Sequence, residues 1–190
     1  MTFLHNDITE QVLFKLTDYN KAIATTPSER QNKSGWTKVF QNQSLTCQNS
    51  SPSLLLIGDS IIAGLDRYNK VKKKFCESYS TINCGIGGDR TQHVLWRCEK
   101  MVLPTSLKHA VVNCGTNNLK QDSPLDIASG IILVGLALKK KCPHINVIIT
   151  GIIPRGLKWS RIRSKINKTN LILKKLSKIN ELFYKDNNFG

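Results

Sequence analysis

The chain has 190 residues, 40% of them hydrophobic, which is enough for one folded domain with an appendage. Its 28 lysines and arginines outnumber 13 aspartates and glutamates, and the net charge of +15 favours anionic partners such as nucleic acid. No apolar run reaches the length of about eighteen residues that a membrane span needs. The N-terminus lacks the pattern of a signal peptide. These features argue against a membrane-spanning or secreted protein and predict a cytoplasmic one.

Six cysteines are scattered along the chain without a Cys-x-x-Cys pair: Cys47, Cys76, Cys84, Cys98, Cys114 and Cys142. This spacing predicts neither a zinc site nor a disulfide framework. We therefore expect a reducing compartment, buried thiols that act as small apolar side chains, and no metal or organic cofactor.

The first 52 residues differ in composition from the rest. Residues 6–24 place apolar side chains at helical spacing, which predicts an amphipathic helix: Ile8, Val12, Leu16, Tyr19 and Ile23. Residues 25–51 are rich in Ser, Thr, Asn, Gln and Lys, and we expect a mostly unstructured linker there. The predicted division is thus an N-terminal helix and polar linker over residues 1–52 and one domain over residues 53–190.

From residue 54 onward, predicted strands and helices alternate. Strands are expected at residues 54–57, 78–83, 109–113 and 146–151, and the last of these is apolar enough to be buried on both faces. Helices are expected at residues 91–101, 123–141 and 159–179, the second of which begins with Ser123 as cap, Pro124 at its first position and Asp126 at its third. This alternation predicts an α/β fold with a parallel sheet and right-handed crossovers.

The first strand ends at Gly58-Asp59-Ser60, and an apolar helix face follows at Ile61, Ile62 and Leu65. A polar residue at such a turn lies at the carboxyl edge of the sheet, where ligands bind in open α/β folds. On this triplet alone two interpretations are open. Asp59 and Ser60 cap the helix, or Ser60 is a nucleophile near the positive end of the helix dipole.

Two later segments close apolar runs with glycine and asparagine: residues 83–91, Asn-Cys-Gly-Ile-Gly-Gly-Asp-Arg-Thr, and residues 112–118, Val-Asn-Cys-Gly-Thr-Asn-Asn. Together with residues 58–60 they resemble the first three sequence blocks of the SGNH (GDSL-type) hydrolases. With residues 93–97, His-Val-Leu-Trp-Arg, and 151–156, Gly-Ile-Ile-Pro-Arg-Gly, they resemble the catalytic α subunits of intracellular platelet-activating-factor acetylhydrolase. The resemblance covers about residues 53–180.

The resemblance implies a flavodoxin-like three-layer α/β/α fold and a serine esterase that acts on short acyl esters such as acetyl esters. It makes Ser60 the nucleophile. It also implies that the backbone N–H groups of Ser60 and Gly88 and the side-chain amide of Asn117 form the oxyanion hole. All three residues follow the ends of predicted strands, so a parallel sheet is expected to bring them together.

The family takes its catalytic base from an Asp-x-x-His block near the C-terminus. Asp186 stands where the aspartate is expected, but Phe189 stands where the histidine is expected. The family's fifth strand and C-terminal helix have no clear counterpart, so the resemblance predicts a fold that is incomplete at its C-terminus and an esterase that is weak or inactive. His93 is the nearest alternative base, although it is expected to pack on a helix.

Three further expectations follow. A non-catalytic basic domain that binds nucleic acid is the main alternative function, because esterase-like domains of this class also occur in retroelement proteins. The unpaired edge of the strand at residues 146–151 predicts a homodimer or aggregate. The N-terminal helix can instead pair with a partner chain.

Overall fold

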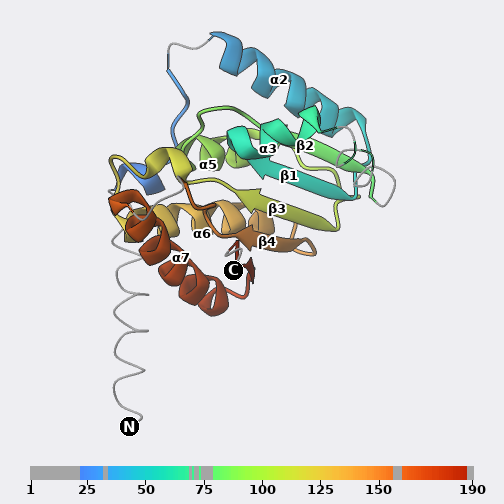
Figure 1. The fold of residues 1–190 in the computed structure, drawn as a ribbon. Coiled ribbons are helices and arrows are strands. Elements are labelled where there is room, and N and C mark those ends of the chain that lie inside the picture. Colours follow the sequence, from blue (N-terminus) through green and yellow to red (C-terminus); the bar gives the residue numbers. More distant parts are fainter. Residues whose placement is uncertain are drawn as a thin grey trace.

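The computed structural model describes residues 22–31, 34–68, 70, 73, 79–155 and 160–187. The predicted N-terminal helix lies almost wholly outside these residues. The core is a five-stranded sheet in which all neighbouring strands are parallel, in the order β2-β1-β3-β4-β5 (Figure 1). The strands are β1 (Leu54–Gly58), β2 (Thr81–Gly85), β3 (His109–Asn113), β4 (Asn146–Thr150) and β5 (Phe183–Lys185).

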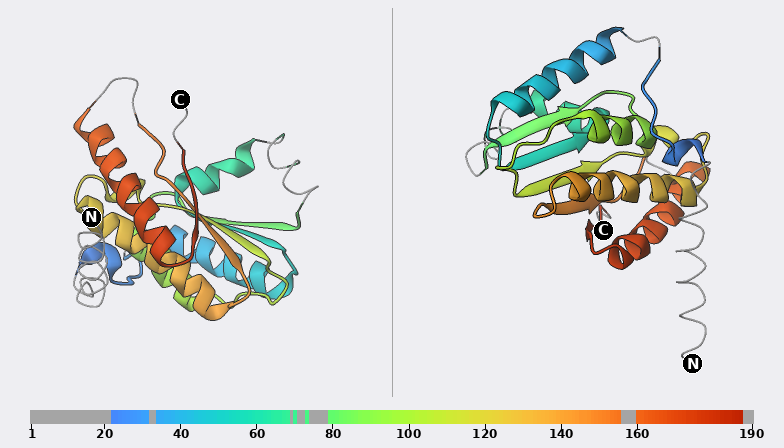
Figure 2. Two further views of the ribbon diagram at one scale, coloured as in Figure 1. Left: turned by 90° about the horizontal axis from the view of Figure 1, so that it is seen from below. Right: turned by 180° about the vertical axis from the view of Figure 1, so that it is seen from behind.

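Helices cover the sheet on both sides, so the predicted three-layer α/β/α architecture is confirmed. One side carries α5 (Thr91–Lys100), α6 (Pro124–Lys141) and α7 (Arg161–Ile179), and the other carries α3 (Ser60–Gly64) (Figure 2). Short 3-10 turns complete the chain: η1 (Ile23–Thr25), η2 (Leu65–Arg67) and η3 (Thr116–Asn118). No helix in the described residues has the length and apolar character needed to cross a membrane.

Local sequence signals account for the regular elements. The start of α6 is as predicted: Ser123 Oγ accepts a hydrogen bond from the Asp126 amide at 3.2 Å, and Asp126 Oδ2 accepts one from the Ser123 amide at 3.3 Å. This reciprocal cap satisfies two backbone donors that a helix start otherwise leaves free. Pro124 occupies the first helical turn, where its missing N–H has no cost.

The two faces of the sheet differ in how they are covered. The face under α5, α6 and α7 is fully buried, and its strand residues include Leu55, Ile57, Val112, Val147 and Ile149, all at 0% exposure. It forms the main core. Five cysteines in the described residues are free and buried, and all five belong to this core as small apolar groups.

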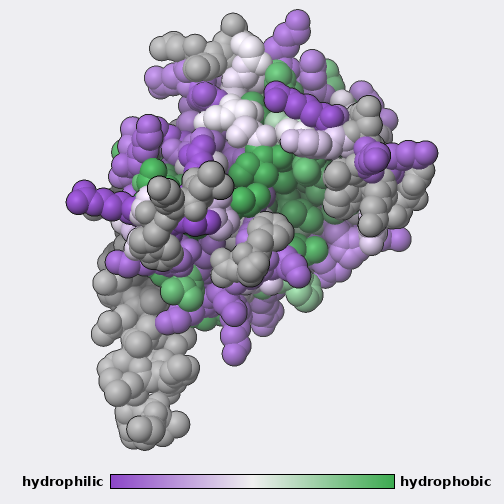
Figure 3. All heavy atoms as spheres, viewed as in Figure 1, coloured by the Kyte–Doolittle hydropathy of each residue, from purple (hydrophilic) through white to green (hydrophobic). Residues whose placement is uncertain are grey.

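The opposite face is covered mainly by α3. Leu54, Leu56 and Ile62 are buried there, and Leu65 and Val111 are partly buried against them. Across the neighbouring strands Val111 is paired with Ile148, which is half-buried, and Ile148 is paired with Phe183, which is 61% exposed. Apolar side chains gather at the centre of this face (Figure 3). The expectation that β4 is buried on both faces is therefore wrong, because only one of its faces packs under helices.

A fifth strand is present, contrary to the sequence-based expectation. β5 pairs in parallel with β4, with Ile148 opposite Phe183 and Thr150 opposite Lys185. A strand of three residues is shorter than the usual ~5–6 and leaves no periodic pattern to detect. Because β5 occupies the edge of β4, the reason given for a homodimer no longer holds. The homodimer itself stays a prediction.

The expected linker is also wrong, because residues 34–49 form a helix, α2 (Ser34–Asn49), that packs on the domain. Trp36 is 4% exposed and Cys47 is fully buried. The Trp36 ring lies 5.6 Å from Trp96 and 5.8 Å from Phe40, centroid to centroid. Trp36, Phe40 and Cys47 fall on one helix face, which the polar residues between them obscure. The division of the chain at residue 52 stays a prediction.

Candidate active site

Ser60 is the first residue of α3, directly after β1 and its N-cap Asp59. Asp59 Oδ1 accepts a hydrogen bond from the Ile61 amide at 2.9 Å, so the cap is the aspartate. The Ser60 side chain is exposed, and no hydrogen bond within the described residues engages its hydroxyl. Asp59 alone therefore caps the helix, and the Ser60 hydroxyl is available to a ligand.

The loop after β2 passes beside Ser60. The Ile86 amide donates to the Gly58 carbonyl at 3.1 Å, which ties this loop to the end of β1. A Cβ built on Gly87 would lie 3.9 Å from the Ser60 Cβ. Gly88 has a φ of +78°, a left-handed conformation that glycine adopts without strain. The sequence block around Gly88 therefore lies against the serine, as a parallel sheet requires.

Asn117 lies in η3, after β3, and its position is fixed by the same loop. Its Nδ2 donates to the Asp89 carbonyl at 2.8 Å. An amide group has two N–H donors, and within the described residues only one of them is engaged. The ends of β1 and β3 flank the point at which the strand order reverses, and such a switch point is the usual ligand site of open α/β sheets.

A buried ion pair holds this edge together, and the sequence did not indicate it. Arg97 Nε lies 2.9 Å from Asp89 Oδ2, and both side chains are fully buried. The other arginine nitrogens donate to the Cys84 carbonyl at 2.8 Å and the Gly58 carbonyl at 2.9 Å, at the ends of β2 and β1. Trp36 Nε1 donates to Asp89 Oδ1 at 2.7 Å. Burial raises the pKa of Asp89, and Arg97 and Trp36 offset that effect in part.

Asp59 is the second buried carboxyl at this edge. Its Oδ2 is buried without a hydrogen-bond partner in the described residues. Burial raises the pKa of Asp59 to about 6, an effect that the Ile61 amide reduces and the nearby Asp89 strengthens. This carboxyl next to Ser60 is thus only weakly held in its charged form.

None of the three described histidines bonds to Ser60. His93 Nδ1 accepts a hydrogen bond from the Arg90 amide at 3.1 Å, so a neutral ring carries its proton on Nε2. Burial and the charges of Arg30, Arg90 and Arg97 lower the pKa of His93 to about 4. His109 begins β3, and His144 precedes β4, so both lie at the amino edge of the sheet, away from Ser60.

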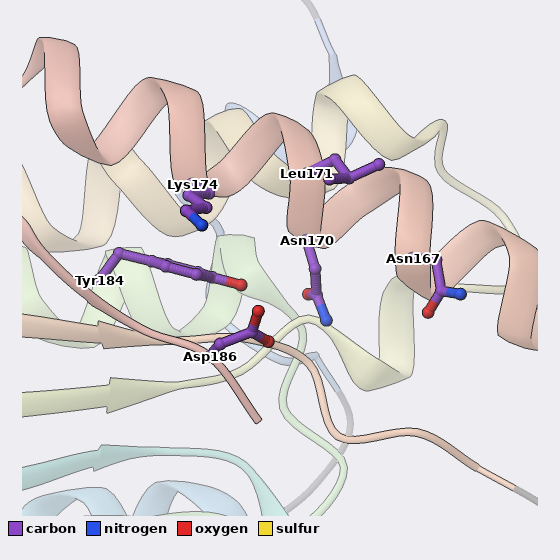
Figure 4. Close-up of a pocket in the computed structure, with 6 residues that line it drawn as sticks. All are labelled: Asn167, Asn170, Leu171, Lys174, Tyr184 and Asp186. Atoms are coloured by element: carbon purple, nitrogen blue, oxygen red, sulfur yellow. The ribbon is translucent and has the colours of Figure 1, made fainter. Parts of the chain in front are cut away.

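Asp186 follows β5 and lines a different recess. Its carboxyl, the Tyr184 hydroxyl and the Asn170 amide point toward one another beneath α7 (Figure 4). This hollow of about 220 Å³ is lined by Asn167, Asn170, Leu171, Lys174, Tyr184 and Asp186. The structure thus brings Ser60, Gly88 and Asn117 together and leaves Asp186 apart from them. Within the described residues no cluster of His, Cys, Asp or Glu could hold a metal ion.

A parallel sheet in this order, with serine, glycine and asparagine at its carboxyl edge, is the arrangement that the resemblance to the SGNH (GDSL-type) hydrolases predicts. Comparisons with known proteins agree. The chain is 32% identical over 154 residues to the human platelet-activating factor acetylhydrolase IB subunit alpha2. It is 35% identical over 129 residues to the subunit of the same name from Gallus gallus.

These alignments cover 80% and 67% of this chain, and it spans 66% and 56% of the length of those relatives. A GDSL-like lipase from Bacteroides thetaiotaomicron has the same fold, with a TM-score of 0.62, 21% identity, and 77% of this chain and 78% of that one covered. A scan against models of protein families finds no match. The chain belongs to the SGNH (GDSL-type) hydrolase family.

Proposed function

We propose that this chain carries a serine esterase site that acts on short acyl esters, such as acetyl esters, with Ser60 as the nucleophile. The observation that carries the proposal is the convergence at one edge of a free serine hydroxyl, the Gly87–Gly88 turn and the anchored Asn117 amide. The names of the curated relatives, acetylhydrolase subunits, support the acetyl group as the acyl part.

The chemistry follows from these positions. Ser60 Oγ adds to the ester carbonyl carbon, and the oxygen of that carbonyl takes the negative charge. The amides of Ser60 and Gly88 and the free N–H of Asn117 stabilise this charge, because donors that are already in place need no reorganisation. The intermediate then expels the alcohol, which leaves with the proton, and water hydrolyses the acyl-serine.

The rate is expected to be low. A serine hydroxyl reacts slowly unless a base removes its proton, and no described histidine contacts Ser60. Triad enzymes that lose a member still retain about 10³–10⁴-fold catalysis over water from the oxyanion hole and binding. We therefore propose a weak esterase whose activity depends on oxyanion stabilisation.

Hydrolysis of 4-nitrophenyl acetate tests this proposal. The wild-type chain is expected to exceed the rate in buffer, and Ser60→Ala is expected to abolish the excess. Ser80→Ala is the matched control, since Ser80 is an exposed serine directly before β2, at the opposite edge of the sheet. Equal rates for wild type and Ser60→Ala would overturn the proposal. The nucleic-acid alternative stays a prediction and is distinguished by its strong dependence on salt.

A further inference from the structure

Arg30 lies directly over the proposed oxyanion loop. Its segment, residues 22–31, crosses from beside α5 to the start of α2 (the blue stretch in Figure 1). Arg30 Nη1 donates to the Gly87 carbonyl at 2.7 Å and lies 3.8 Å from Asp89 Oδ1. A Cβ on Gly88 would meet Arg30 Nη2 at 2.9 Å, so the guanidinium covers the outer side of this glycine.

The Asp89 carboxylate has two arginine partners. Arg30 and Arg97 both face the carboxylate of Asp89, and Arg97 is the nearer partner, at 2.9 Å. Arg97 is fully buried, with its donors engaged by Asp89 and by the carbonyls of Cys84 and Gly58. Arg30, whose side chain is 21% exposed, is therefore the partner of Asp89 that a ligand can reach.

Arg30 also has donors that no hydrogen bond within the described residues engages. A guanidinium has five N–H groups, and one is used by the Gly87 carbonyl. Gly87 lies between this guanidinium and Ser60, since its own Cβ would be 3.9 Å from the Ser60 Cβ. A substrate bound at Ser60 can thus contact Arg30, because only Gly87 lies between the two side chains. The effect of Arg30 on His93, whose pKa it helps to lower, is consistent with a positive potential at this loop.

We propose that Arg30 determines the substrate class of the Ser60 site: an ester that carries a second, anionic group, a carboxylate or a phosphate, which pairs with the guanidinium. The planar fork of arginine suits both groups because it binds their oxygens in pairs. This inference rests on the proposed function. Its competitor is a purely structural Arg30 that only fastens residues 22–31 to the loop.

The test is the rate at which Ser60 is labelled by paired fluorophosphonates, measured by intact-protein and peptide mass spectrometry. In this reaction the Ser60 oxygen bonds to phosphorus, and fluoride leaves together with the proton. One pair carries a terminal carboxylate or its methyl ester, and the other carries a terminal phosphate or its neutral dimethyl ester. The ratio of anionic to neutral rates isolates charge recognition from general reactivity, and the two pairs distinguish the two anions.

In wild type the anionic reagent of at least one pair is expected to react about tenfold faster, the scale of a hydrogen bond to a charged group. This ratio should fall as salt screens the charge. Arg30→Gln should bring it close to one, and Arg30→Lys should restore it in part. Arg67→Gln, which removes an exposed arginine from η2, should leave it unchanged.

A structural role for Arg30 would slow both reagents of a pair equally in Arg30→Gln, and the unchanged ratio would overturn the inference. Equal labelling by the anionic and neutral reagents in wild type would also overturn it, while Ser60 labelling itself would still support the esterase site. If no reagent labels Ser60, the proposed function fails, and the inference fails with it.

Discussion

Both faces of the sheet carry apolar side chains, but the two faces differ in how deeply these side chains are buried. On the face under α5, α6 and α7, Val147 and Ile149 of β4 are fully buried. On the other face Ile148, between them in the sequence, is half-buried beside the exposed Phe183. The side chains alternate because a strand has a period of two. The covered face therefore holds most of the stability, whereas the open face and the adjoining carboxyl edge are free to carry a site.

The largest effect is expected where α2 extends the covered side of the domain. Trp36→Ala removes a buried ring that stacks on Phe40, packs at a tilt against Trp96 and donates to the buried Asp89. We expect a loss of about 3–5 kcal/mol in the free energy of unfolding, as for other large aromatic truncations in a core. Urea denaturation followed by circular dichroism measures it.

Val39→Ala is the matched control, since Val39 lies on the same helix and is 42% exposed. Its effect should stay within about 0.5 kcal/mol. If Trp36→Ala were equally mild, residues 34–49 would not be an integral part of the fold in solution.

A pair of identical substitutions on β4 compares the two faces directly. Ile149→Ala leaves a cavity in the main core and should cost about 2–5 kcal/mol. Ile148→Ala removes the same atoms from the half-buried face and should cost less than about 1.5 kcal/mol. Both changes have the same effect on strand propensity, so the difference reports burial alone. Similar losses in urea denaturation would show that the open face is covered in solution by something else.

A smaller effect is expected from Asp59, next to the proposed nucleophile. Its pKa is about 6 in the folded chain, above its ordinary value of 3.8. The folded state therefore binds this proton more tightly than the unfolded state, and stability falls as pH rises from about 4 to 6. Above that range the full cost remains, on the order of 1–3 kcal/mol. Asp59→Asn keeps the helix cap and cannot ionise, so it should gain stability relative to wild type as pH rises.

The measurement is the difference in melting temperature between Asp59→Asn and wild type at pH 4 and pH 7. Asp66→Asn, at an exposed carboxyl of η2, provides the control for general charge effects. A difference that stays constant, or that shrinks at the higher pH, would contradict the buried charge at Asp59.

Local signals in the sequence determined much of this protein. The apolar runs ahead of Gly58 and Asn113, the capping residues of α6 and the alternation of elements predicted a parallel α/β fold. The order of the glycine and asparagine blocks predicted which residues meet at its edge. These predictions succeeded because periodicity, caps and strand–helix turns depend on residues a few positions apart. Parallel strands with crossovers then place all their carboxyl ends on one side.

What only the tertiary structure decided depends on contacts between distant segments. The many polar residues of α2 hid its helical pattern in the sequence, and the contact of Trp36 with Trp96 is seen only in the folded chain. The strand β5 is too short to show a periodic pattern and is recognised only by its pairing with β4. The ion pair of Asp89 and Arg97 and the position of Arg30 over Gly88 are equally invisible in the sequence. Arg30 and Gly87 are separated by 57 residues, and only the folded sheet brings them within 2.7 Å. A side chain acquires such a role from the neighbours that folding supplies, and no local pattern records it.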